Sequence, residues 1–144
     1  MSFALLAAVH LAATGFMVGL MWTIHVVHYP LFALVNEPYR PFQEAHMARI
    51  SRLLVVPWGV EVVSAAVLVL AAPSGSDRLL ALVGLALVGA VLAITAFGAA
   101  PLHGRLVERF DDDLHHRLLQ VDLVRTLLWT ARLGPALALV VRSA

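Results

Sequence analysis

The stretch His25-Val26-Val27-His28-Tyr29-Pro30 ends the first long apolar segment of the chain, which runs from Phe3 to Val27. That segment has roughly 25 mostly apolar positions, enough for a helix to cross a bilayer. In such a helix His25 and His28 are three residues apart and share one face. Pro30 is expected to end or kink the helix. A secretory signal peptide is the competing interpretation, but no basic residue precedes the run, and the run is too long.

The composition indicates a membrane protein. The chain has 144 residues, of which 61% are hydrophobic and 13% charged, and its mean hydropathy is +0.89. A soluble domain is nearer half apolar and a quarter charged. This chain has too little polar surface to remain dissolved, so the lipid bilayer is its expected partner.

Several chemistries are excluded by missing residue types. The chain has no cysteine, which rules out disulfides, thiolate metal sites and a cysteine nucleophile. All ten basic residues are arginine, so a Schiff-base lysine is impossible and a retinal-lysine photoreceptor is excluded. The net charge of +1 points to no nucleic-acid partner.

The apolar pattern predicts four helices, at about residues 3–28, 42–72, 78–101 and 114–142, joined by short connections. Pro57 should kink the second helix, and Pro101 should end the third. We therefore expect an all-α membrane protein in which residues 1–144 form a single transmembrane domain. The expected architecture is an antiparallel four-transmembrane-helix bundle.

The arginines predict the orientation of the bundle. Six of them fall in the first and third connections or beside them, and only two lie at the opposite side. The positive-inside rule places the arginine-rich side in the cytoplasm and both termini outside. The six are Arg40, Arg49, Arg52, Arg105, Arg109 and Arg117, and the two are Arg78 and Arg142.

This topology gathers six of the seven histidines at the cytoplasmic mouth of the bundle, with His10 as the exception. Neutral imidazole is a ligand for iron, copper and zinc. We predict a transition-metal site (Fe, Cu or Zn) formed by His28, His46 and His103, with His25 as a further candidate. Histidines at helix ends also commonly lie at the membrane interface, and this interpretation is preferred for His115 and His116.

Ionisable side chains inside the predicted spans should face the bundle interior and form pairs, because each costs about 2.5–3.5 kcal/mol on insertion scales. Glu61 is expected to pair with Arg125 or Arg132. As candidate catalytic residues, Glu61 would be a metal ligand or proton-transfer base, and Arg125 would set its charge state. A purely structural role for the pair is the alternative. The candidate substrate-binding residues are Tyr29, Asp122, Trp129 and Arg132.

Five groups of residues form a pattern that resembles an uncharacterised family of small bacterial four-span membrane proteins. They are His28-Tyr29-Pro30-Leu31-Phe32, His46 with Arg49, Pro57 with Glu61, Pro101-Leu102-His103, and Arg125-Thr126 with Trp129 and Arg132. The resemblance covers most of the chain. It implies a multi-pass protein of the bacterial inner (cytoplasmic) membrane, and it implies no particular activity.

A more limited resemblance is to the HemJ-type four-span protoporphyrinogen oxidases. It rests on size, topology, the early histidine His10, and Gly19-Leu20 ahead of a Pro-Leu-Phe turn. It implies porphyrinogen oxidation and binding of haem b, with His10 as a cofactor ligand. The chain differs from this pattern in its several cytoplasmic-side histidines and its lack of lysine.

The sequence thus favours a metal-dependent membrane oxidoreductase or oxygenase acting on a lipophilic small molecule. A haem-binding oxidase is one alternative. A proton-coupled carrier is another, and it would need a homo-oligomer because four helices are few for a carrier. A non-catalytic membrane subunit is the last.

Overall fold

The computed structural model describes residues 2–35 and 38–143, which are almost entirely helical and contain no strand in those ranges. The helical elements are α1 (Phe3–Thr23), η1 (Ile24–His28), η2 (Pro30–Leu34), α2 (Tyr39–Ala71), α3 (Gly75–Ile94), η3 (Thr95–Ala99), α4 (Ala100–Glu108) and α5 (Asp112–Ser143). The two elements η1 and η3 are π-helical turns, and η2 is a 3₁₀ helix.

Within the described residues, these elements join into four helical segments that are long and apolar enough to cross a membrane, as the sequence predicts. Their bounds are Phe3–Leu34, Tyr39–Ala71, Gly75–Glu108 and Asp112–Ser143. Large apolar side chains are exposed along all four, and Phe97 and Leu70 are 86% and 81% exposed. Burial inside the bundle cannot account for such side chains, whereas contact with lipid can.

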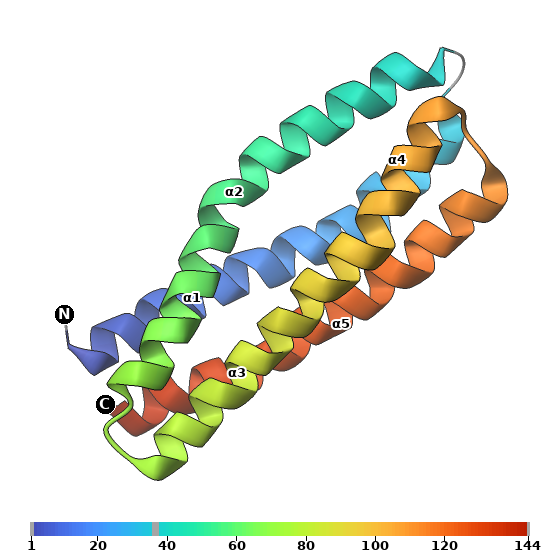
Figure 1. The fold of residues 1–144 in the computed structure, drawn as a ribbon. Coiled ribbons are helices and arrows are strands. Elements are labelled where there is room, and N and C mark those ends of the chain that lie inside the picture. The colour runs from blue at the N-terminus through green and yellow to red at the C-terminus, as the bar shows by residue number, and fades with distance from the viewer. Residues whose placement is uncertain (1, 36–37, 144) are drawn as a thin grey trace.

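The four segments form an elongated bundle (Figure 1). Both termini lie at the same end as the turn between α2 and α3, and the connections before α2 and after α4 lie at the other end (Figure 1). Helix α5 packs against α1 and α3, and α2 also contacts both of these helices. The larger apolar cluster surrounds Tyr29 and Phe32, and a smaller one near the termini includes Leu6, Leu68 and Leu139.

The π turn η1 changes which residues of the first segment face inward. The Tyr29 N–H donates to the Ile24 carbonyl five residues earlier, at 2.8 Å. The inward stripe therefore passes from Ile24 to Tyr29, and both are buried. His25 and His28, which the sequence places on one helix face, lie beside this stripe: both are half-buried, and they contact the buried Asp122 and His46. An extra residue in the turn shifts the helical register between Ile24 and Tyr29.

A second π turn, η3, explains why Pro101 does not end the third segment. The sequence predicted a helix end at Pro101, but helix α4 continues to Glu108. After the π turn, Pro101 lies in the first turn of α4, a position where proline is common. The proline is therefore accommodated inside a continuous helical segment.

Helix α2 runs without interruption through Pro57 and bends near its middle (Figure 1). Proline has no N–H to donate to the carbonyl four residues earlier, and its ring displaces that carbonyl, so a bend is expected there. On the N-terminal side of the bend, α2 diverges from the chain around η3 and meets α4 again near its own start, where Gln43 contacts His103 (Figure 1). The bend therefore leaves room between α2 and the η3–α4 segment.

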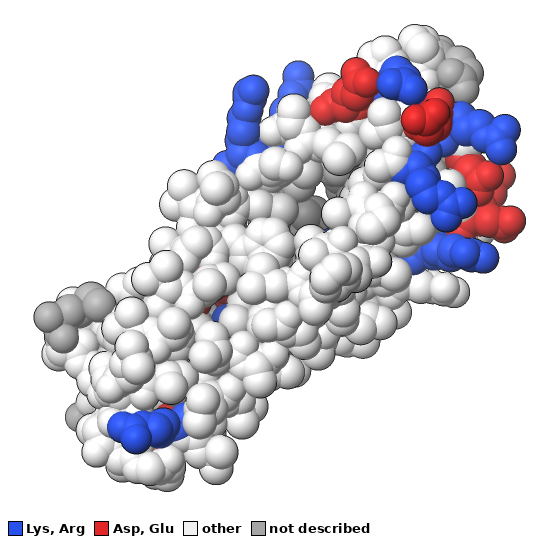
Figure 2. Space-filling model, viewed as in Figure 1, with Lys and Arg blue, Asp and Glu red and all other residues white. Residues whose placement is uncertain are grey.

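Charged side chains concentrate at one end of the molecule. On the face drawn in Figure 2, most of the coloured residues gather around the end that carries α4, and a smaller basic patch marks the opposite end. The same face is hollowed between the N-terminal half of α2 and α4 (Figure 2).

Candidate functional site

Two imidazoles from different helical segments share a hydrogen bond near the charged end. Nε2 of His28, in η1, lies 2.8 Å from Nδ1 of His46, in α2. The His46 ring also packs against Phe32, with ring centroids 4.9 Å apart, and the other ring nitrogen of His46 has no partner in the described structure. This arrangement leaves one buried imidazole nitrogen available to a ligand.

His103, from α4, lies beside this pair, with its ring centroid 5.5 Å from that of His46. The Gln43 side-chain amide donates to His103 Nδ1 at 2.9 Å. In a neutral imidazole the second nitrogen then carries the proton, so His103 Nε2–H donates to the Tyr29 hydroxyl at 2.9 Å. Tyr29 consequently keeps its own hydroxyl proton for another acceptor.

The backbone of the same region is held from α5. The Tyr29 carbonyl accepts a hydrogen bond from Nε2 of His115 at 2.8 Å. His115 was expected to lie at the membrane interface, but it is buried, whereas His116 is exposed. His115 is therefore a second donor to this carbonyl, beside the Phe32 N–H at 3.1 Å, and it ties the end of η1 to α5.

Asp122 and Arg125 form a second polar level on α5. Asp122 is fully buried, and its Oδ2 lies 3.1 Å from Nδ1 of His25. Its other oxygen is 4.0 Å from the Arg125 guanidinium, which is too long for a hydrogen bond. Nη2 of Arg125 contacts the Met21 sulfur at 3.7 Å, and Nε of Arg125 has no partner within the described residues.

Glu61 forms a third level, deeper in the bundle. Its Oε1 accepts a hydrogen bond from Arg132 Nη1 at 2.8 Å, and its Oε2 accepts one from Trp129 Nε1 at 2.7 Å. All three residues are buried. The Glu61–Arg132 contact is one of the two pairings predicted from the sequence. It supplies the counter-charge that each ion needs in an apolar interior.

His10, in α1, contacts α2 one helical turn after Glu61: its Nδ1 is 2.7 Å from the Ser64 hydroxyl. That hydroxyl also donates to the Val60 carbonyl at 2.6 Å. A hydroxyl has one proton, so Ser64 accepts from His10 Nδ1–H while it donates to Val60. His10 is therefore oriented by a local polar contact, far from the other six histidines.

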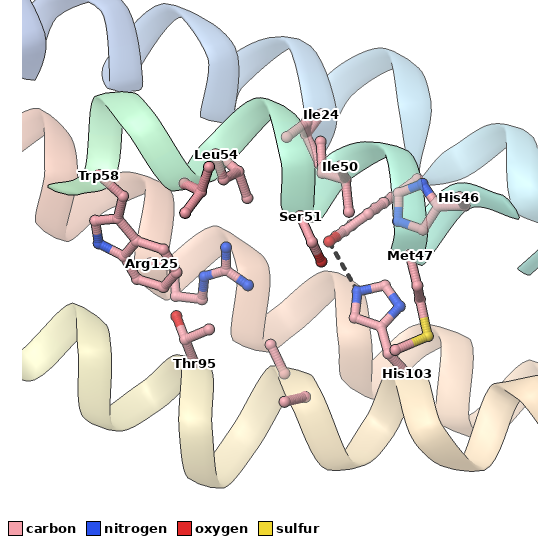
Figure 3. A pocket seen from close by; sticks show the side chains of 14 residues that line it. Ile24, His46, Met47, Ile50, Ser51, Leu54, Trp58, Thr95, His103 and Arg125 are labelled. Carbon is pink, nitrogen blue, oxygen red and sulfur yellow. Dashed lines mark hydrogen bonds between the residues drawn. The ribbon is translucent and has the colours of Figure 1, made fainter. Parts of the chain in front are cut away.

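A pocket of about 290 Å³ opens beside the histidines, in the space left by the bend of α2. Its walls are mainly apolar, with polar groups contributed by four helical segments (Figure 3). In Figure 3, His46 and His103 lie towards one end of the pocket, and Trp58 and Arg125 towards the other. We call it the lateral pocket; its lining residues are Ile24, Tyr29, His46, Met47, Ile50, Ser51, Leu54, Val55, Trp58, Thr95, Ala99, Ala100, His103 and Arg125.

The structure brings together some of the predicted site residues and separates others. His28, His46 and His103 lie together, and Tyr29 joins them. His25 lies apart from them and contacts Asp122. Trp129 and Arg132 surround Glu61 and do not line the lateral pocket.

No preassembled metal centre is present in the described part of the chain: no three or more His, Cys, Asp or Glu residues there are grouped so as to hold an ion. Both ring nitrogens of His103 are engaged by Gln43 and Tyr29. The predicted metal site thus reduces to the His28–His46 pair, with His103 as its neighbour.

Sequence reasoning missed Gln43 and Ser64, and it assigned His115 to the membrane interface. Each lies on the same helix face as a predicted site residue: Gln43 precedes His46 by three positions, and Ser64 follows Glu61 by three. Helical spacing from the ionisable residues could have identified them. The prediction of buried contacts relied on the cost of placing a charge in the membrane, and the neutral side chains of Gln43 and Ser64 carry no such cost.

Comparison with known proteins found no match to this chain among protein-family models, curated proteins or solved structures.

Proposed function

We propose that the chain is a multi-pass protein of the bacterial inner membrane, folded as an antiparallel four-helix bundle. The four apolar segments and the exposed apolar side chains along them support insertion in a bilayer. The gathering of charge at the end opposite the termini supports a cytoplasmic location for that end and an external location for both termini.

Within this membrane protein, the lateral pocket is the site of an oxidoreductase that acts on a lipophilic small molecule. The observation that carries this proposal is the meeting of apolar walls with imidazole and phenol groups in one cavity. A lipophilic molecule would gain from the apolar walls, while His46, His103 and Tyr29 offer groups that accept and donate protons. Tyr29 is suited to donate because His103 occupies its oxygen as an acceptor and leaves its proton free.

The His28–His46 pair is the proposed site of a transition metal. His28 Nε2 and His46 Nδ1 share a hydrogen bond of 2.8 Å, so a bound metal ion would replace the proton between them. A bound Fe, Cu or Zn would supply redox or Lewis-acid chemistry, and two protein ligands leave open positions for substrate.

The role of Glu61 changes with this assignment. Both of its carboxylate oxygens are occupied by Arg132 and Trp129, and it does not line the lateral pocket. We therefore assign Glu61 a structural role, as the counter-charge of Arg132, and assign proton transfer to the groups around Tyr29.

Metal analysis of the purified protein tests this function. We expect stoichiometric Fe, Cu or Zn in the wild-type protein and less than about a tenth of that in His28→Ala or His46→Ala, since each removes half of the proposed ligand pair. His116→Ala is the matched control, because His116 is exposed at the same end of the molecule. Metal-free wild-type protein, or equal metal in all variants, would contradict the metal assignment.

The same preparation tests haem b, the alternative cofactor. A Soret absorption band that disappears in His10→Ala would replace the metal assignment with a haem site near His10. Absence of the band together with stoichiometric metal would exclude the haem alternative.

A further inference from the structure

Arg125 is a buried cation whose hydrogen-bonding capacity is largely unused. A guanidinium has five N–H donors. Among the described residues, Arg125 contacts the Met21 sulfur at 3.7 Å, Asp122 at 4.0 Å and the Tyr29 hydroxyl, and its Nε has no partner. Arg125 is 5% exposed and lines the lateral pocket, where its guanidinium points into the space below Leu54 (Figure 3).

The neighbouring carboxylate does not satisfy this cation. Asp122 is nearer to His25 than to Arg125, at 3.1 Å against 4.0 Å, and its hydrogen bond goes to the histidine. Arg132, seven residues further along α5, provides the contrast. It binds its own carboxylate, Glu61, at 2.8 Å, and does not line the pocket. The lateral pocket is therefore lined by a guanidinium, that of Arg125, which has no carboxylate of the described residues within hydrogen-bonding distance.

The remainder of the pocket selects an apolar ligand. Its walls include Ile24, Ile50, Leu54 and Val55, and Val55 is 65% exposed at its rim. A volume of about 290 Å³ holds roughly ten heavy atoms, taking about 30 Å³ for each water-sized group. A longer chain would pass the exposed rim of α2 and continue along the apolar surface.

The geometry points to a single-chain lipophilic carboxylic acid as the ligand of the lateral pocket, with its carboxylate on Arg125. This inference rests on the proposed function and names the substrate class of that site. The planar fork of a guanidinium matches a carboxylate in bidentate geometry. A phosphate monoester carries about −1.5 to −2 charges, which one arginine cannot balance.

Arg125 would fix the acid group at one end of the pocket. The apolar part of the molecule would then lie along the pocket walls formed by α2 and η3, and His46 and His103 would lie towards the other end (Figure 3). This placement would present a carbon of the ligand, rather than its carboxylate, to the proposed reactive groups.

Quenching of Trp58 by dibromostearic acid tests the inference, because Trp58 lines the pocket and bromine quenches indole fluorescence at contact. The protein is titrated in detergent with excess EDTA, and the methyl ester of the same acid is the neutral comparison. We expect saturable quenching, absent in Trp58→Phe, with the acid bound at least about tenfold more tightly than the ester. A charge-assisted hydrogen bond has this order of strength.

Arg125→Gln should remove the preference for the acid, so that acid and ester bind equally. Arg52→Gln is the matched control: it removes an exposed charge from α2 one residue from the pocket-lining Ser51, and should change affinity less than about twofold. If Arg125→Gln does not fold, Ser51→Phe fills the pocket while keeping Arg125, and should abolish saturable quenching.

Equal binding of acid and ester by the wild-type protein would overturn the inference, as would acid binding that survives both Arg125→Gln and Ser51→Phe. Displacement of the probe by a lysophosphatidic acid but not by oleate would overturn the choice of carboxylate over phosphate. Because the assay contains EDTA and requires no turnover, its failure leaves the metal analysis as a separate test of the proposed function.

Discussion

Arg125 and Arg132 are two buried guanidinium groups seven residues apart on α5, and their surroundings give them different tasks. Arg132 is buried and paired with Glu61, so its charge is balanced inside the bundle. Arg125 lines a pocket and lacks a close carboxylate partner. The sequence predicted that both would face inward, because a charge facing lipid is costly. It could not decide between them, since helical spacing places both near Glu61.

Substitution of Glu61 by Gln should destabilise the protein strongly. The variant keeps an acceptor for Trp129 but leaves Arg132 buried without a counter-charge. Breaking a buried pair in this way costs about 3–5 kcal/mol. Thermal unfolding in detergent, followed by circular dichroism, measures the loss. Glu44→Gln is the control, since the Glu44 side chain is 57% exposed and its contact with Arg40 is long, at 3.5 Å.

The double variant Glu61→Gln with Arg132→Met should recover part of that stability, because it removes the unpaired cation and keeps similar volume. If Glu61→Gln alone has the same thermal unfolding midpoint as the wild-type protein, the Glu61–Arg132 ion pair does not stabilise the fold. The structural role assigned to Glu61 would then be wrong.

At the scale of elements, helix existence follows from apolar periodicity and length, and all four segments were predicted. The π turns were not, because no local residue pattern specifies them. Their effect is large at the site: η1 buries Tyr29 in place of His28, and η3 moves Pro101 into a first helical turn. The hydrogen bonds of His46 to His28 and of His103 to Gln43 and Tyr29 depend on these register shifts and were therefore beyond sequence reasoning.

The bend at Pro57 should control the size of the lateral pocket. In Pro57→Ala the backbone N–H at position 57 can donate to the Leu53 carbonyl, which straightens α2 towards α4. We expect unchanged or higher thermal stability and several-fold weaker binding of dibromostearic acid, measured by Trp58 quenching. Pro135→Ala is the matched control, because Pro135 lies within α5 and does not line the pocket.

Undiminished acid binding in Pro57→Ala, with Pro135→Ala also unchanged, would show that the pocket does not depend on the bend. The shape of the lateral pocket would then depend on the side chains of α2 and not on the bend of the α2 helix axis.

At the scale of the whole molecule, the absence of cysteine makes the orientation testable by single substitutions. Gly75 and Asp113 are exposed at opposite ends of the bundle, and neither contributes a positive charge. In intact cells a membrane-impermeant maleimide should label Gly75→Cys and not Asp113→Cys. After permeabilisation it should label both. The reverse pattern would place the arginine-rich end outside and contradict the positive-inside assignment.

The membrane class followed from composition, and the gathering of most histidines followed from helix order alone. The position of the pocket did not, because it depends on the bend of α2 and on the separation of α2 from the η3–α4 segment beside that bend. Sequence periodicity describes which face of a helix is apolar. It carries no information on the separation of helix axes.

The π turns also affect how this chain should be compared with others. Each adds one residue to a helix, so the apolar positions before and after residues 24–28 and 95–99 belong to different helical phases. A homologue with the same fold but ordinary helical turns would align only with a one-residue gap in each place. Alignment methods that forbid gaps inside helices would then place Tyr29 and His103 one position away from their true equivalents.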